Sequence, residues 1–119
     1  MQNLEERIEK LEKQSIGNRL LTTLVNVELH IYKAEICRGR WGSPGGIDIG
    51  VLELAEARRI LDYTPWPEEL ADSAKNANAR IEKYAGYLKN KDITMVSYED
   101  TRMKEAFKKL EEAVLEWVG

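Results

Sequence analysis

The sequence has very few residues that form covalent cross-links or histidine-based metal sites. It has one cysteine, Cys37, so no disulfide can form within the chain, and this favours a reducing, cytoplasmic setting. Zinc and di-iron sites in proteins use several histidines, or Glu-x-x-His pairs, and the chain has only His30. We therefore interpret His30 as a satisfied, partly buried side chain, and the leading interpretation includes no cofactor.

Long apolar runs and an excess of basic charge are also missing. No run of about 18 apolar residues occurs, so neither a transmembrane helix nor a membrane partner is expected. Lys and Arg total 18 against 21 Asp and Glu, which argues against a nucleic-acid partner. The acidic, amphipathic N-terminus differs from a signal peptide. High Glu, Lys and Arg beside two Gln hint at a thermophilic source.

The sequence does contain enough apolar material for one domain, residues 1–119. Its 43% hydrophobic and 33% charged residues fit a folded globular protein. Helical spacing predicts an all-α four-helix bundle with a long N-terminal helix, with helices at about 4–37, 49–62, 67–90 and 98–118. Residues 93–96 are interpreted as a short extended piece. The expected helix starts are Asn3, Asp48, Pro67 and Ser97.

The first predicted helix organises the rest of the chain. Its residues 20–37 are apolar on nearly every side of a helical wheel, so we expect a central helix with partners nearly all round. A narrow apolar seam, spaced as in a coiled coil, opens the helix and continues in the same register. The seam begins with Leu4, Ile8 and Leu11, passes through Ser15, Asn18 and Thr22, and ends with Val25, Leu29, Tyr32 and Ile36.

An unbroken first helix would be longer than the bundle. Helices of 20 residues span about 30 Å, so roughly a dozen N-terminal residues would project with their seam bare. We interpret Leu4, Ile8 and Leu11 as a contact in a homo-oligomer, with a dimer favoured. The alternative is a break near Gly17, after which the first segment folds back on its own bundle.

Two acidic pairs lie on neighbouring predicted helices, Glu53 with Glu56 and Glu69 with Asp72. A spacing of three puts each pair on one helix face, and facing carboxylates suit Mg²⁺. The arrangement is similar to that of the all-α nucleoside triphosphate pyrophosphatases of the MazG-like group. This resemblance covers residues 53–72 and implies that the four acids hold magnesium while water attacks the phosphate chain. The alternative is that they form solvated helix faces.

Two further carboxylates, Glu28 and Glu35, lie seven residues apart on the mostly apolar stretch 20–37. A buried carboxylate must be paired or must shift its pKa. Arg58, Arg59 or Arg80 are the expected structural partners. In the alternative, Glu28 joins the acidic cluster on the second and third helices.

The Gly- and Pro-rich segment after the first helix is another candidate surface. Arg38 and Arg40 can clamp an anion, while Trp41 and Trp66 are typical interface anchors. The segment has no Gly-Lys-Ser/Thr, so it is not a phosphate-binding loop of that kind. The alternative is a plain connector with Trp41 folded onto the end of the bundle.

These patterns favour a self-associating interaction or assembly module without catalytic activity. A protein partner would contact the 38–50 loop and Trp66. The alternative is the magnesium-dependent pyrophosphatase, in which Mg²⁺ is the cofactor. A weaker alternative is a small-anion sensor that uses Arg38 and Arg40.

Overall fold

Four α-helices form the regular structure in a computed structural model, which describes residues 3–38 and 45–119. They are α1 (Leu4–Arg38), α2 (Gly46–Tyr63), α3 (Glu68–Lys89) and α4 (Ile93–Val118). No strand occurs in these two described ranges. The predicted all-α four-helix bundle is therefore confirmed.

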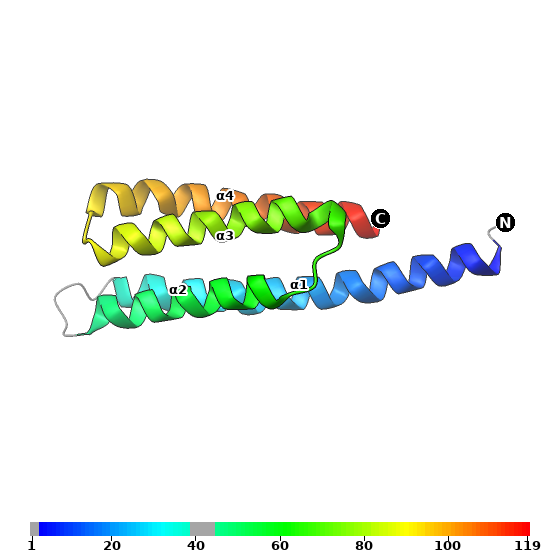
Figure 1. Ribbon diagram of the computed structural model, residues 1–119, viewed down its shortest axis with the longest axis horizontal. Helices are drawn as coiled ribbons and strands as arrows, with labels where there is room; N and C mark the ends of the chain where they lie inside the picture. The colour runs from blue at the N-terminus through cyan, green and yellow to red at the C-terminus, as the bar shows by residue number, and fades with distance from the viewer. Residues whose placement is uncertain (1–2, 39–44) are drawn as a thin grey trace.

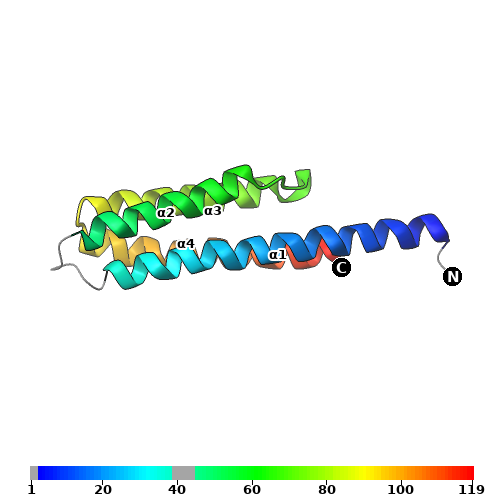
Figure 2. The ribbon, with the colours of Figure 1, turned by 90° about the horizontal axis from the view of Figure 1, so that it is seen from below.

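The helices run alternately up and down, and neighbours in the chain are neighbours in space (Figure 1). α1 also packs on α4, which closes the ring, as the view from below shows (Figure 2). Short connectors keep successive helices antiparallel. The principal extents are 62 × 20 × 18 Å, because α1 continues well past the ends of the other helices. None of the described helices combines the length and apolarity needed to cross a bilayer.

A column of buried apolar side chains from all four helices forms the core. On α3, six residues separated alternately by four and three positions are buried, as expected for one face of a helix. An apolar face of α4 is also turned inward. The inward residues of these two helices are Leu70, Ala74, Ala77, Ile81, Tyr84 and Leu88 on α3, and Met103, Ala106, Phe107, Leu110 and Val114 on α4.

Helix α4 begins earlier than the sequence analysis predicts. The side chain of Asp92 accepts a hydrogen bond from the backbone N–H of Met95 at 3.2 Å, so Asp92 caps the helix. The predicted extended piece at 93–96 is wrong, and Ser97 lies inside the helix. Asp92 supplies the cap about one turn before Ser97 could do so.

Helix α2 also starts differently, whereas the start of α1 is confirmed. α2 begins at Gly46 after Gly45, whose φ of 78° is in the left-handed region that glycine adopts readily. Asp48 therefore lies in the first turn and is not the N-cap, although a carboxylate is favourable there. At the start of α1, the side chain of Asn3 accepts a hydrogen bond from the backbone N–H of Glu6 at 2.8 Å.

Helix α1 passes through Gly17 without a break, so the predicted alternative of a fold-back is wrong. Gly17 is buried against Val118 near the end of α4, where a Cβ atom would collide with a methyl group of Val118. The Lys13 ammonium also lies 5.1 Å from the centre of the Trp117 ring. The glycine therefore allows α1 and the end of α4 to approach each other closely. Residues 4–15 are all exposed beyond this point, and we call them the overhang.

The structure corrects the expectation that residues 20–37 form a central helix. α1 occupies one corner of the bundle and packs mainly on α2 and α4. Its outer residues Val25, Leu29, Tyr32 and Ile36 are exposed. The bundle therefore covers one side of an apolar helix and leaves the other bare.

We predict that Gly17→Ala and Gly86→Ala will change stability in opposite directions. At Gly86 in α3 an added Cβ meets nothing within 4 Å, so alanine should stabilise by about 0.5–1 kcal/mol through helix propensity. At Gly17 the clash with Val118 should cancel this gain and destabilise by roughly 1 kcal/mol or more. Urea denaturation measures both changes. Equal stabilisation by the two variants would contradict the close approach of Val118 to Gly17. As a control, the destabilisation by Gly17→Ala should disappear in a Val118→Ala background.

Candidate functional site

Helix α1 carries two apolar faces on opposite sides. The inner face is buried, with Leu20, Leu24, Val27, Ile31 and Ala34 in the core. Seven large apolar side chains on the outer face are between 45% and 69% exposed. With three polar residues they form what we call the outer seam: Leu4, Ile8, Leu11, Ser15, Asn18, Thr22, Val25, Leu29, Tyr32 and Ile36.

The outer seam has coiled-coil spacing along the whole of α1. Steps of four and three residues alternate from Leu4 to Ile36, which is the pattern that a second helix can follow. The seam is apolar at both ends and polar in the middle. There the Thr22 hydroxyl donates a hydrogen bond to the backbone carbonyl of Asn18 at 2.9 Å. A surface of this shape and polarity suits a helical partner.

On the α2 side of the seam, one short contact ties α1 to its neighbour. His30 Nδ1 lies 2.6 Å from Glu53 Oε2, and the two side chains are 20% and 26% exposed. This pairing confirms the interpretation of His30 as a satisfied, partly buried residue. It also commits Glu53 to a contact with α1.

On the α4 side, a lysine lies between two carboxylates. Lys104 Nζ is 3.2 Å from Glu35 Oε1 and 3.2 Å from Asp100 Oδ2. Burial raises the pKa of Glu35, and the carboxyl group of Asp100 raises it further. Glu35 thus pairs with a lysine instead of an arginine. The arginines predicted for this role pair elsewhere, Arg58 with Glu82, Arg59 with Glu56 and Arg80 with Glu99.

The four acids of the predicted magnesium site do not meet in the structure. Glu53 contacts His30, and Glu56 accepts hydrogen bonds from Arg59. Glu69 and Asp72 lie in the first turns of α3 and are exposed. The two pairs therefore lie on different parts of the bundle.

The pairing of α2 with α3 explains this separation. Asn78 Nδ2 donates to Asp62 Oδ1 at 2.6 Å, and Arg58 Nε donates to Asn78 Oδ1 at 2.8 Å. Arg58 is thus level with Asn78, which puts Glu56 and Asp72 roughly 12 Å apart along the axis at about 1.5 Å per residue. Within the described ranges, no group of three or more His, Cys, Asp or Glu side chains could hold a metal ion. The pyrophosphatase stays a prediction from the sequence.

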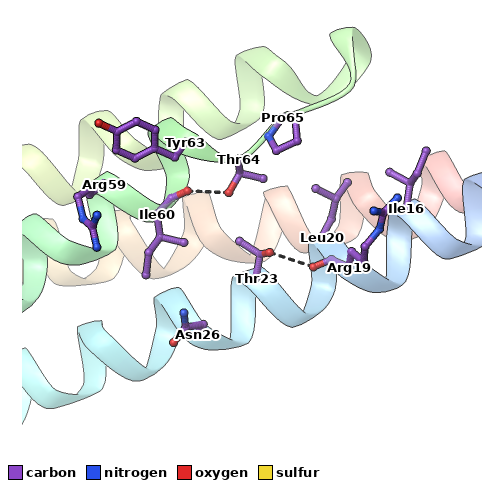
Figure 3. A pocket seen from close by; sticks show the side chains of 10 residues that line it. All are labelled: Ile16, Arg19, Leu20, Thr23, Asn26, Arg59, Ile60, Tyr63, Thr64 and Pro65. Carbon is purple, nitrogen blue, oxygen red and sulfur yellow. Dashed lines mark hydrogen bonds between the residues drawn. The ribbon is translucent and has the colours of Figure 1, made fainter.

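A groove of about 780 Å³ lies between α1 and the end of α2 (Figure 3). Its walls are apolar at Leu20, Ile60 and Pro65, and Arg19 and Arg59 lie at its edges. Several polar side chains that line the groove already form hydrogen bonds within the chain. Arg59 is bound to Glu56, and the hydroxyls of the lining residues Thr23 and Thr64 donate to the backbone carbonyls of Arg19 and Ile60.

The predicted contact surface around the first loop lies mostly outside the described residues. Neither Arg40 nor Trp41 is described, and nor is the side chain of Arg38. Trp66 is described, and its ring N–H donates to the backbone carbonyl of Leu61 at 3.0 Å while the ring packs on the core. The roles of these residues in binding a partner or an anion stay predictions.

Sequence reasoning missed half of the outer seam as a candidate surface. It followed the register from Leu4 to Ile36 but assigned residues 25–36 to a helix with partners all round. A usable signal was present, because α1 has a second series with the same spacing, from Leu20 to Ala34. Two such series on one helix indicate two separate binding faces. The groove had no comparable signal, since its residues come from distant segments.

Comparison of the chain with protein-family models, with curated proteins and with solved structures found no match. The outer seam is the candidate site that the geometry of the described residues supports best.

We predict that Glu28→Gln will stabilise the protein at neutral pH. Burial and the nearby Glu111 raise the pKa of Glu28, so its charged form is penalised in the folded state. The penalty is present at pH 7 and disappears as the pH falls and the carboxyl is protonated in both states. The gain at pH 7 should stay below about 1 kcal/mol, because solvent screens this partly exposed group.

Thermal unfolding at pH 7 and pH 4 measures this difference. The exposed Glu9→Gln on the same helix controls for the general loss of one negative charge. A difference in unfolding temperature between Glu28→Gln and the natural protein that grows toward pH 4 would contradict a raised pKa for Glu28.

Proposed function

We propose that this protein is a self-associating interaction module that binds a second copy of itself through the outer seam. The observation that carries the proposal is the exposure of the seam's apolar side chains in two stretches of α1, residues 4–11 and 25–36. Scattered apolar residues are normal on protein surfaces, but apolar residues gathered on one helix face commonly mark an interaction site. Here these residues are ordered by coiled-coil spacing.

The overhang supports this proposal independently. Its twelve positions from 4 to 15 are helical and exposed on every side. An isolated helix of about this length is marginal in water, since few side-chain contacts offset the entropy of ordering it. A partner helix along Leu4, Ile8 and Leu11 would supply the missing contacts.

The free energies involved favour a reversible complex. Fully burying a large apolar side chain contributes about 1.5–3 kcal/mol, and the seven on each copy are already about half buried. A dimer would then gain on the order of 10 kcal/mol, against an association cost of about 4–15 kcal/mol. Because the two are similar in size, the dimer fraction should depend on protein concentration.

We predict that polar substitutions in the outer seam will abolish self-association and leave the fold intact. Leu11→Gln with Leu29→Gln removes two apolar residues of each copy from the interface, and both are more than half exposed in the single chain. We expect dimer affinity to fall by at least about a hundredfold, given the burial of a leucine side chain. Sedimentation velocity over a concentration series measures this change.

A matched control removes apolar surface outside the seam. Leu52 and Leu115 are 69% and 52% exposed, close to the 63% of Leu11 and the 52% of Leu29. The Leu52→Gln, Leu115→Gln variant should associate like the natural chain. A natural chain that remains monomeric at high concentration, or a control that loses association equally, would overturn the proposal.

A further inference from the structure

We infer that two copies associate through their outer seams as an antiparallel dimer, with the two-fold axis beside residue 20 of α1. This inference rests on the proposed function, because it specifies the partner and the register for the same surface. Each overhang would lie along the segment 25–36 of the other copy. That segment is held straight by its own bundle.

The outer seam pairs with itself about this axis. In the antiparallel register, the numbers of two opposing seam positions always add to 40. The apolar overhang of one copy then meets apolar residues of the other, and polar residues meet near the axis, with Ser15 and Val25 as the one mixed pair. The opposing pairs are Leu4 with Ile36, Ile8 with Tyr32, Leu11 with Leu29, Ser15 with Val25, and Asn18 with Thr22.

Charged residues beside the seam fit the same register. Glu35 and Asp100 share one cation, Lys104, which contacts Glu35 Oε1 and Asp100 Oδ2. The second carboxylate oxygen of Asp100, Oδ1, is buried without a hydrogen-bond partner among the described residues. In the antiparallel dimer, Arg7 of the second copy comes opposite Glu35. It would bring the positive charge that this cluster lacks. On the other flank, Glu5 comes opposite Lys33, which adds a second pair of opposite charges.

One contact of this arrangement is unfavourable. Arg19 flanks the seam at the axis, so the two copies of Arg19 come close to each other. Arg19 is exposed and lines the open groove, so water and salt screen the repulsion. Four favourable charge pairs per dimer, two at each end, outweigh one screened repulsion at the centre.

A parallel dimer would use the same seam less well. The two overhangs would leave the bundles as a free stalk with three apolar layers, which is a marginal length for helices in water. Arg7 would lie about 40 Å from the Glu35 cluster, at roughly 1.5 Å per residue. The antiparallel dimer instead braces each overhang and brings Arg7 to the acidic pair.

Disulfide trapping with single-cysteine variants tests the register. In a Cys37→Ser background, Leu11→Cys and Leu29→Cys chains of different mass are mixed and mildly oxidised. A disulfide needs Cα atoms within about 7 Å. Position 11 faces position 29 in the antiparallel dimer, whereas two copies of position 11 are about 27 Å apart. We expect the mixed 11–29 product in at least tenfold excess over the 11–11 product.

The outcomes separate the two proposals. Excess 11–11 product would overturn the antiparallel register and keep self-association through the seam. Sedimentation as a monomer without any cross-linking would overturn both. A dimer that gives neither product above the level of a Leu29→Cys and Leu52→Cys mixture would also overturn both, because Leu52 lies outside the seam and is similarly exposed.

Discussion

The structure depends on one constraint, which is that α1 carries two apolar faces while the bundle can cover only one. The core needs the inner face, since Leu24, Val27 and Ala34 close the column of side chains from the other helices. The outer face lies opposite and is beyond the reach of α2 and α4. A chain with this pattern either exposes two apolar stretches of one helix face or binds something along them. The proposed antiparallel dimer would cover the outer face while the bundle covers the inner face.

Close contacts between α1 and the end of α4 set the path of α1 at the end of the bundle. Because Gly17 has no side chain, Val118 at the end of α4 can pack closely against α1, and Lys13 lies over the Trp117 ring. Helix α1 therefore continues without a break past the end of the bundle. The overhang is therefore a continuation of the helix that the core holds in place. Its apolar residues remain in register with those at 25–36, which is why one partner helix can follow the full seam. In the proposed dimer, flanking charges such as Glu35 would favour the antiparallel direction of the partner helix.

Much of this fold could be predicted from the sequence, because helical spacing alone separates inward from outward residues on α3 and α4. The start of α4 could not be predicted from the sequence, because Asp92 and Ser97 are both residue types that cap helices well. Which of them caps α4 depends on the packing of the folded chain. The separation of the four acids of the predicted magnesium site could not be predicted for a similar reason. Spacing puts Glu53 and Glu69 on helix faces, but the alignment of α2 with α3, fixed by Asn78, decides whether they meet. The sequence predicted the overhang. The other half of the outer seam, residues 25–36, was mistaken for part of the core.

Hydrogen exchange of the backbone amides at residues 4–15 tests most directly whether a second copy orders the overhang. These amides have little tertiary protection within one chain, because the overhang is exposed and extends beyond the bundle, with only its last turn reaching Trp117 through Lys13. If a second copy orders the overhang, its amides should exchange rapidly in dilute protein and slowly at concentrations where the dimer forms, while core amides near Val27 stay protected throughout. Protection of the overhang that does not change with concentration would contradict the account.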